Sequence, residues 1–153
     1  MKTALISNPI KDAGFACAAK VAEYLLAKNT EVFSDKDGIF PGVKTLPLAE
    51  CVKNADVVIT VGGDGTILHT ASVSAKAGVP LVGINLGKVG YMAEIEPDEL
   101  ALLDRLFDKN YTSEKRMLLD AKVIRDGKTV FTAIALNDAV ISRGGKLRMS
   151  NIT

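Results

Sequence analysis

The stretch from Asp56 to Thr66 constrains the fold most, because an apolar run there ends abruptly in three glycines around one carboxylate. Residues Val57 to Val61 are mainly β-branched and are followed by glycines and polar residues, which is typical of a buried strand in a parallel sheet. Ile67 to Ala77 has helical propensity, and Gly78 is a plausible stop. A strand, a glycine-rich turn and a helix N-terminus predict an anion site, since glycine permits close backbone approach and the first helical N–H groups are unpaired. We interpret the anion as a phosphate.

Asp64 is the unusual residue of this turn. A carboxylate beside phosphate oxygens is repelled unless it holds a metal ion or takes a proton from an attacking hydroxyl group. Both roles belong to phosphoryl transfer. The alternative is that Asp64 only caps the helix that begins near Thr66. The glycines on both sides favour catalysis, because a cap does not need them.

Length and composition exclude several functional classes. The 153 residues amount to about one domain, with room for part of a second. A formal net charge of +1 gives no electrostatic case for nucleic acid or an anionic membrane. Cys17 and Cys51 show no CxxC spacing, so we expect reduced, buried thiols. Residues 1–9 are too short for a secretory signal or a membrane span, and we expect a cytoplasmic protein.

Strand and helix patterns alternate before and after the central strand. The expected elements are a strand at 3–7, a helix at 15–26 that Asp12 could cap, a strand at 31–33, a connection with little regular structure at 35–47, a short helix at 48–53, a strand at 80–85 and a helix from Pro97 to Phe107. The first strand–helix–strand unit lacks the GxGxxG fingerprint, which argues against an ordinary dinucleotide-binding dehydrogenase.

The loop from Leu86 to Tyr91 is a second candidate part of the site. Gly83 to Lys88 superficially has the form of a Walker loop, but Val89 stands where that motif needs a metal-binding Ser or Thr, and we reject it. We expect the loop glycines to pack against a ligand or against the Gly62 to Thr66 turn. Tyr91 could form a wall for a planar ring, with core packing as the alternative.

His69 is the only histidine and lies five residues after Asp64. It could face the site or lie on the helix surface, and the residues alone favour the surface.

Near Arg116 the pattern changes to strands only. Segments 119–124 and 129–136 flank Asp126-Gly127, which predicts a hairpin. We therefore expect an α/β domain over residues 1–115, with a Rossmann-like parallel sheet, and an incomplete antiparallel β domain over 116–153. These few strands cannot form an independent β domain, so we expect that further chain or a partner completes it.

Asn137 and Asp138 lie between apolar residues at the end of the second hairpin strand. A buried amide and carboxylate there would suit recognition of ribose hydroxyls or an adenine edge. A polar turn is the alternative.

The whole chain resembles the N-terminal portion of an NAD kinase. The GGDGT turn alone also marks lipid kinases and related sugar kinases, but in order with four other blocks it is specific. The matching blocks are Asn8-Pro9, Gly62 to Thr66, Gly83 to Tyr91, Arg116 to Leu119 and Asn137 to Val140.

The resemblance implies ATP-dependent phosphorylation of the 2′-hydroxyl of the adenosine ribose of NAD, with Mg²⁺, giving NADP. It implies that Asp64 accepts the hydroxyl proton and that the backbone of Gly62, Gly63, Gly65 and Thr66 lines the phosphate site. It assigns no metal ligand, and it implies a homo-oligomer. The implied NAD-binding residues are Asp64, Gly65, His69, Asn85, Tyr91, Asn137, Asp138 and Arg148. For Arg148, a solvated arginine on a β edge is the alternative.

Two other functions compete with this resemblance. A diacylglycerol-type lipid kinase shares the GGDGT turn, but the Asn85 to Tyr91 loop replaces that family's later loop and no membrane-facing patch stands out. A non-catalytic nucleotide-binding module is the other. Members of the NAD kinase family continue past Thr153 into a β-rich domain, so we expect little kinase activity from these residues alone.

Overall fold

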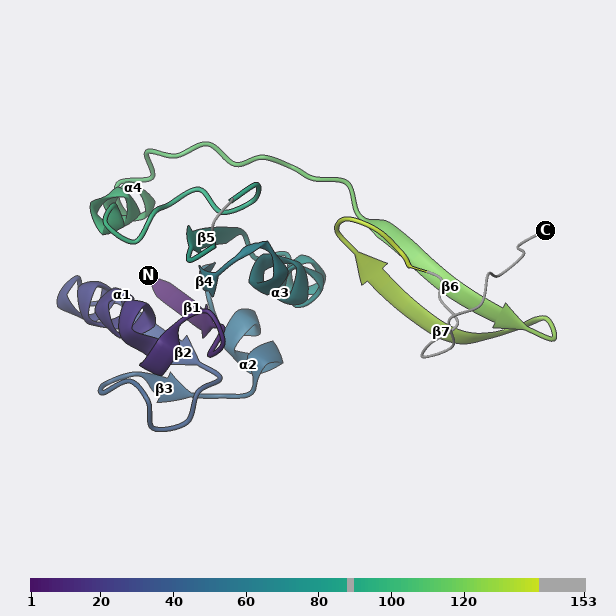
Figure 1. The fold of residues 1–153 in the computed structure, drawn as a ribbon, viewed down its shortest axis with the longest axis horizontal. Helices are drawn as coiled ribbons and strands as arrows, with labels where there is room; N and C mark the ends of the chain where they lie inside the picture. Colours follow the sequence, from purple (N-terminus) through teal and green to yellow (C-terminus); the bar gives the residue numbers. More distant parts are fainter. Residues whose placement is uncertain (88–89, 141–153) are drawn as a thin grey trace. The chain divides into compact units, whose positions relative to one another are not determined.

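The computed structural model describes residues 1–87 and 90–140. They fall into two compact units, Met1–Lys115 and a second that begins at Arg116, and each unit is described by itself. The first unit is built on a five-stranded parallel sheet of order β3-β2-β1-β4-β5 (Figure 1), which confirms the expected α/β class. Its elements are β1 (Lys2–Ser7), η1 (Ala13–Phe15), α1 (Ala16–Ala27), β2 (Glu31–Ser34), β3 (Lys44–Thr45), α2 (Leu48–Lys53), β4 (Val57–Gly62), α3 (Asp64–Ala77), β5 (Leu81–Asn85), η2 (Leu100–Leu103) and α4 (Asp104–Phe107).

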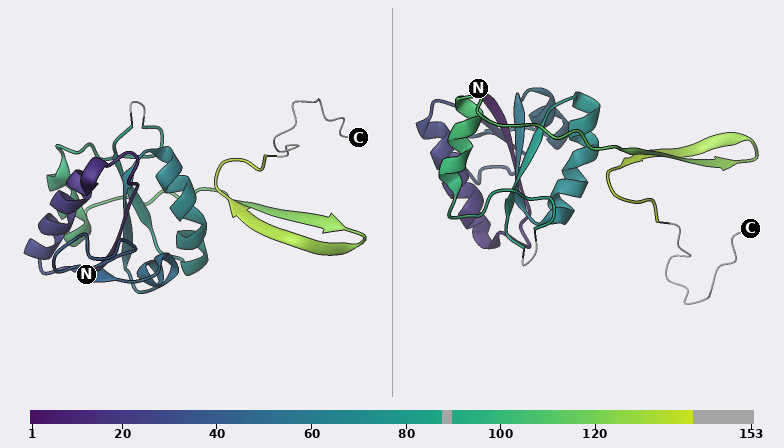
Figure 2. Two further views of the ribbon diagram at one scale, coloured as in Figure 1. Left: turned by 60° about the horizontal axis from the view of Figure 1, so that its bottom comes forward. Right: turned by 90° about the horizontal axis from the view of Figure 1, so that it is seen from above.

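Helices cover both faces of the sheet, so the first unit has three layers. Figure 2 shows the purple and green helices, α1 and α4, on one side of the strands and the teal helix α3 on the other. Neighbouring residues of a strand point to opposite faces, and each face buries its own apolar cluster. One cluster includes Leu5, Ala18, Val21, Leu25, Ile59, Ile84 and Leu103, and the other includes Ala4, Ile6, Phe33, Cys51, Val52 and Val58.

The carboxyl ends of β1, β4 and β5 meet at one edge of the sheet. The register pairs Ser7 with Val61 and Gly62 with Asn85. The strand order reverses between β1 and β4, and in open α/β sheets ligands bind outside the carboxyl ends of the strands at such a switch point. The turn that follows β4 therefore lies where this fold places its ligands.

Two sequence predictions about local structure are wrong, whereas the connection at 35–47 has little regular structure, as expected, with only the two-residue strand β3. Helix α3 begins at Asp64 rather than near Thr66. Pro97 does not begin a helix. It lies in a turn closed by the Glu99 N–H donating to the Glu96 carbonyl at 2.9 Å, and helical structure starts only at Leu100. Proline is favoured at the second position of a β-turn, so Pro97 stabilises a turn here and does not begin a helix.

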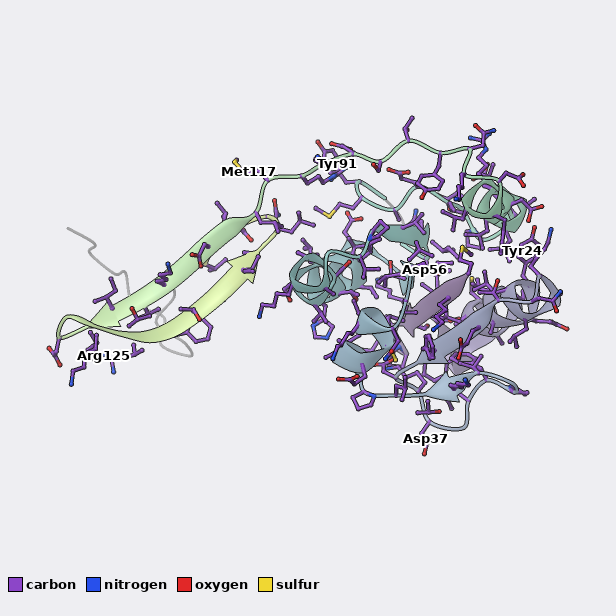
Figure 3. The ribbon with its side chains drawn as sticks, turned by 180° about the vertical axis from the view of Figure 1, so that it is seen from behind. Tyr24, Asp37, Asp56, Tyr91, Met117 and Arg125 are labelled. Carbon is purple, nitrogen blue, oxygen red and sulfur yellow. The ribbon has the colours of Figure 1, made fainter. Side chains whose placement is uncertain are left out.

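The second unit is an antiparallel hairpin of β6 (Leu119–Arg125) and β7 (Lys128–Ala135), as the sequence predicted. Asp126 and Gly127 form its turn with φ of 50° and 72°, and Arg125 marks the tip in Figure 3. The register places Leu119, Ala121, Val123, Phe131, Ala133 and Ala135 in directly opposed pairs. A two-stranded hairpin with such an apolar face is marginal in water on its own.

Within residues 1–87 and 90–140, no helix is both long and apolar enough to cross a bilayer.

Candidate active site

Gly62 ends β4, and the close approach of helix α3 requires glycine there. A Cβ atom at this position would lie 2.2 Å from Thr66 Oγ1, 3.0 Å from Thr66 Cβ and 3.3 Å from Asn8 Cβ. Asn8 itself follows β1, and its N–H donates to the Val61 carbonyl at 3.0 Å. The turn is therefore packed tightly from behind.

Gly63 and Gly65 are glycines for a different reason. A Cβ atom at either position would meet no other part of the described chain within 4 Å, apart from its chain neighbours and the backbone of α3. Gly63 has φ −109° and ψ −171°, an extended conformation that any residue adopts. Gly65 is exposed in the first turn of α3, where glycine weakens a helix. Neither backbone conformation nor packing among the described residues explains these two glycines. They lie at the start of α3, where the Thr66 N–H donates to the Gly63 carbonyl at 2.8 Å and the N–H groups that precede it have no acceptor one turn earlier in the helix.

Thr66 places an unpaired hydroxyl at the same turn. The residue is 6% exposed, and its Oγ1 atom has no hydrogen-bond partner among the described residues. Buried polar atoms are normally paired, so this buried hydroxyl is an exception within the turn.

Asp64 does not cap α3. The N-cap residue is Gly63, and no side-chain cap hydrogen bond forms. The carboxylate instead accepts hydrogen bonds from two consecutive backbone N–H groups, Tyr91 N at 3.3 Å to Oδ2 and Met92 N at 3.1 Å to Oδ1. The capping alternative is thus wrong, and Asp64 connects the glycine turn to the loop after β5. Sequence reasoning missed this connection because its partners are main-chain groups 27 and 28 residues away.

The loop after β5 is tied to the turn at its start as well. The Leu86 N–H donates to the Gly62 carbonyl at 2.6 Å. Asn85, 6% exposed, accepts a hydrogen bond from the Gly87 N–H at 2.8 Å and donates to Glu96 Oε1 at 3.0 Å. The expected packing of this loop against the glycine turn is therefore present in the structure.

Tyr91 and His69 lie at the surface of the first unit. Tyr91, labelled in Figure 3, is 84% exposed, so its predicted alternative as a core residue is wrong. Its exposed ring is available to stack on a planar ligand. His69 is exposed in the second turn of α3. Both positions remain predicted NAD contacts.

Asn137 and Asp138 follow β7 in the second unit and are exposed, so the expectation of a buried pair is wrong. The segment lies beyond the last residue of β7, Ala135, and residues 137–140 are all exposed. Their role in NAD binding stays a prediction. Arg148 lies outside the described residues.

Asp12 accepts hydrogen bonds from the N-terminus of α1, the other helix that begins at this edge of the sheet. Its side chain is buried, 3% exposed, and accepts hydrogen bonds from Ser7 Oγ at 3.0 Å and from the N–H groups of Cys17 and Ala18 at 2.9 Å each. Asp12 thus accepts N–H groups from the first turn of α1, as its predicted capping role requires, although the N-cap residue of α1 is Phe15. Because its carboxylate already occupies the start of α1, that helix N-terminus is not open to an external anion.

The described residues contain no group of three or more metal-ligating side chains. Mg²⁺ commonly needs only one or two carboxylates when substrate phosphates and water complete its shell. Asp64 supplies one carboxylate at the turn, so the residues present fit a Mg²⁺ ion whose other ligands are phosphate oxygens and water.

The chain is similar in sequence to known NAD kinases. A model of the ATP-NAD kinase N-terminal domain matches residues 3–111. The NAD kinase of Natranaerobius thermophilus is 40% identical over 144 residues, which are 92% of this chain and 50% of that protein. The NAD kinase of Symbiobacterium thermophilum is 46% identical over 98 residues, 63% of this chain and 35% of that protein. The chain spans about half the length or less of these relatives.

Among solved structures, yeast NADH kinase in complex with NADH superposes with a TM-score of 0.74 over 90% of this chain and 47% of that one. At 19% identity this likeness supports the fold alone.

Proposed function

The chain belongs to the ATP-NAD kinase family, and from this premise we propose that it supplies the N-terminal half of an NAD kinase. The full-length protein, meaning the polypeptide of family length that carries this chain, transfers the γ-phosphoryl group of ATP to the 2′-hydroxyl of the adenosine ribose of NAD. The products are NADP and ADP. The family match counts against the lipid kinase alternative.

In the proposed reaction Asp64 is the general base. The 2′-hydroxyl oxygen bonds to the γ-phosphorus of ATP while its proton passes to the Asp64 carboxylate. The bond from the γ-phosphorus to the bridging oxygen breaks, and ADP leaves with that electron pair. Asp64 suits this role because both its oxygens are held by main-chain donors at the edge of the phosphate turn.

One observation carries the proposal: Gly63 and Gly65 leave open space at the start of α3, where an added Cβ atom would meet no described residue within 4 Å beyond its chain neighbours and the backbone of the helix. Their backbone, with that of Gly62 and Thr66, is the proposed cradle of the ATP phosphates. Mg²⁺, when bound, would neutralise phosphate charge beside Asp64. We assign His69, Tyr91, Asn137, Asp138 and Arg148 to the NAD side of the site.

Alanine at Gly63 or Gly65 tests the cradle. A methyl group at either position should leave the free protein as stable or stabilise it, by about 0.5–1 kcal/mol at Gly65, because it meets no atom and reduces backbone freedom. It should raise the Kd for ATP at least about tenfold, since the methyl group occupies the phosphate space. Ala75→Ser, which also adds one heavy atom but at an exposed position near the other end of α3, is the matched control. Unchanged ATP affinity in both glycine variants would remove the phosphate site from this turn.

The substrate is tested with radiolabelled ATP supplied with NAD, with diacylglycerol or with neither. We expect label only in NADP. Label only in lipid would refute the proposal, and ATP binding without any transfer would leave a nucleotide-binding module. The 153-residue chain alone should form little NADP, and robust turnover by it would contradict that expectation.

The proposal also includes location and assembly. Cys17 and Cys51 are free thiols in the structure, in keeping with a reducing, cytoplasmic compartment. We propose a homo-oligomer for the full-length protein, which its mass in solution would test.

A further inference from the structure

The side chain of Asn85 joins the two ends of the loop that follows β5. Its Oδ1 atom accepts the Gly87 N–H at 2.8 Å, and its Nδ2 atom donates to Glu96 Oε1 at 3.0 Å. Its main-chain N–H also donates to the Ile95 carbonyl, at 2.8 Å. One residue therefore fixes both the outgoing segment at Gly87 and the returning segment at residues 95–96.

The same amide group packs against the residue that precedes the two donors to Asp64. A Cβ atom at Gly90 would lie 2.8 Å from Asn85 Nδ2, which shows how closely the two residues approach. The next residues, Tyr91 and Met92, give their N–H groups to the Asp64 carboxylate. Gly90 therefore lies close to the Asn85 amide and directly precedes these two donors in the chain.

The returning segment is held from the other side by β5. The N–H groups of Glu94 and Ile95 lie 3.2 Å from the Gly83 carbonyl. Tyr91 and Met92 therefore lie between two fixed points, the Asn85 amide before them and the Gly83 carbonyl after them.

We propose that Asn85 and Glu96 are a positioning pair, which orients the Asp64 carboxylate through the main chain of Tyr91 and Met92. The inference rests on the proposed function, because it assigns a purpose to the orientation of the general base. It gives Asn85 a role besides the NAD contact that the resemblance implies, since both ends of its amide are engaged within the loop. A shift of about 1 Å in a catalytic group can cost about 10²-fold in rate, so such a pair matters for turnover.

A swap of donor and acceptor tests the pair in the full-length protein. Asn85→Asp keeps the acceptor for Gly87 but turns a second oxygen toward the Glu96 carboxylate, so the contact becomes repulsive. Glu96→Gln in the same protein supplies an amide donor and restores the hydrogen bond in the reverse direction. Glu94→Gln, which removes a charge from the same exposed segment, is the matched control, because no side-chain hydrogen bond or ion pair joins Glu94 to another described residue.

We expect N85D to lower kcat about tenfold or more while the KM for ATP changes less than about twofold, because the base moves and the phosphate cradle does not. N85D/E96Q should recover most of the lost kcat, and N85D/E94Q should not. If N85D/E96Q stays as slow as N85D, the pair does not position Asp64. If kcat follows only the folded fraction measured by thermal unfolding, the role is merely structural and the proposal fails.

Failure of the proposed function would appear separately, as absence of NADP formation by the unmutated full-length protein. The pair is then tested by the backbone amide resonances of Tyr91 and Met92 in the 153-residue chain. Both should shift in D64N and in N85D and return toward their original positions in N85D/E96Q. Resonances that do not respond to N85D would overturn the proposal without any reference to catalysis.

Discussion

Replacement of Gly62 by alanine is the sharpest test of how the glycine turn is built. The added Cβ atom would lie 2.2 Å from Thr66 Oγ1, whereas ordinary contacts begin at 3.4 Å, so the overlap is 1.2 Å (3.4 minus 2.2). Thr66 Cβ, at 3.0 Å, is also too close, and a new rotamer of the threonine cannot move that atom. The first turn of α3 must therefore move away from β4.

Overpacking of a buried site of this kind typically costs about 1–3 kcal/mol, and we expect a loss in that range for Gly62→Ala. Because Asp64 is the first residue of α3, the same movement displaces the proposed base, and kcat should fall by up to about 10²-fold in the full-length protein.

Urea denaturation of the 153-residue chain, followed by circular dichroism, measures the stability term. Thr66→Ala removes the nearest clashing atom, so Gly62→Ala should cost less than about 1 kcal/mol in that background. A cost below about 0.5 kcal/mol for Gly62→Ala alone would refute the reasoning, because it would mean that α3 yields freely at this position.

Three further predictions address single side chains. Asp64→Asn should keep ATP binding but lower turnover about 10²-fold or more in the full-length protein, and comparable turnover would exclude Asp64 as the base. Hydrogen bonds from the Lys28 ammonium group and, to a smaller extent, from the Tyr24 hydroxyl group lower the pKa of Asp104. The ionised Asp104 carboxylate therefore stabilises the fold fully above the ordinary carboxyl pKa of about 4, and this stabilisation is lost as the pH falls through the lowered pKa. The difference in Tm between the original chain and Asp104→Asn should therefore shrink on acidification, and a constant difference would contradict this. Burial raises the pKa of Cys51 to about 11, so mass spectrometry should find it unalkylated at about pH 8 in the folded chain and alkylated in denaturant; equal rates in both states would refute the burial argument.

The sequence predicted the alternation of strands and helices well where local signals are strong. The apolar run at β4, the glycine after α3 with φ 69° and the Asp126-Gly127 turn each carry their structure in a few adjacent residues. Errors occurred where one residue type serves two purposes. Pro97 was predicted to start a helix but lies in a β-turn. The start of α3 was predicted too late because glycine, which disfavours helices, occupies position 65, although α3 begins at Asp64.

The candidate site was only partly predictable for a related reason. The sequence identified Asp64, the glycines and the loop after β5 as neighbours, because parallel strands bring their carboxyl ends to one edge. It could not predict that the Asp64 carboxylate accepts main-chain N–H groups, since every residue except proline offers the same donor. The buried hydroxyl of Thr66 and the Asn85–Glu96 hydrogen bond likewise depend on tertiary distances that no local pattern encodes.

That Asp64 is held by main-chain donors has a consequence for how this site tolerates mutation. Tyr91 and Met92 contribute N–H groups, not side chains, to the carboxylate, so substitution at either position leaves the donor in place unless proline is introduced. The exposed ring of Tyr91 can therefore be exchanged while Asp64, the proposed base, keeps its hydrogen bonds. On that proposal, the orientation of the base and the preference for a stacking ligand depend on different atoms of one residue and can be varied independently.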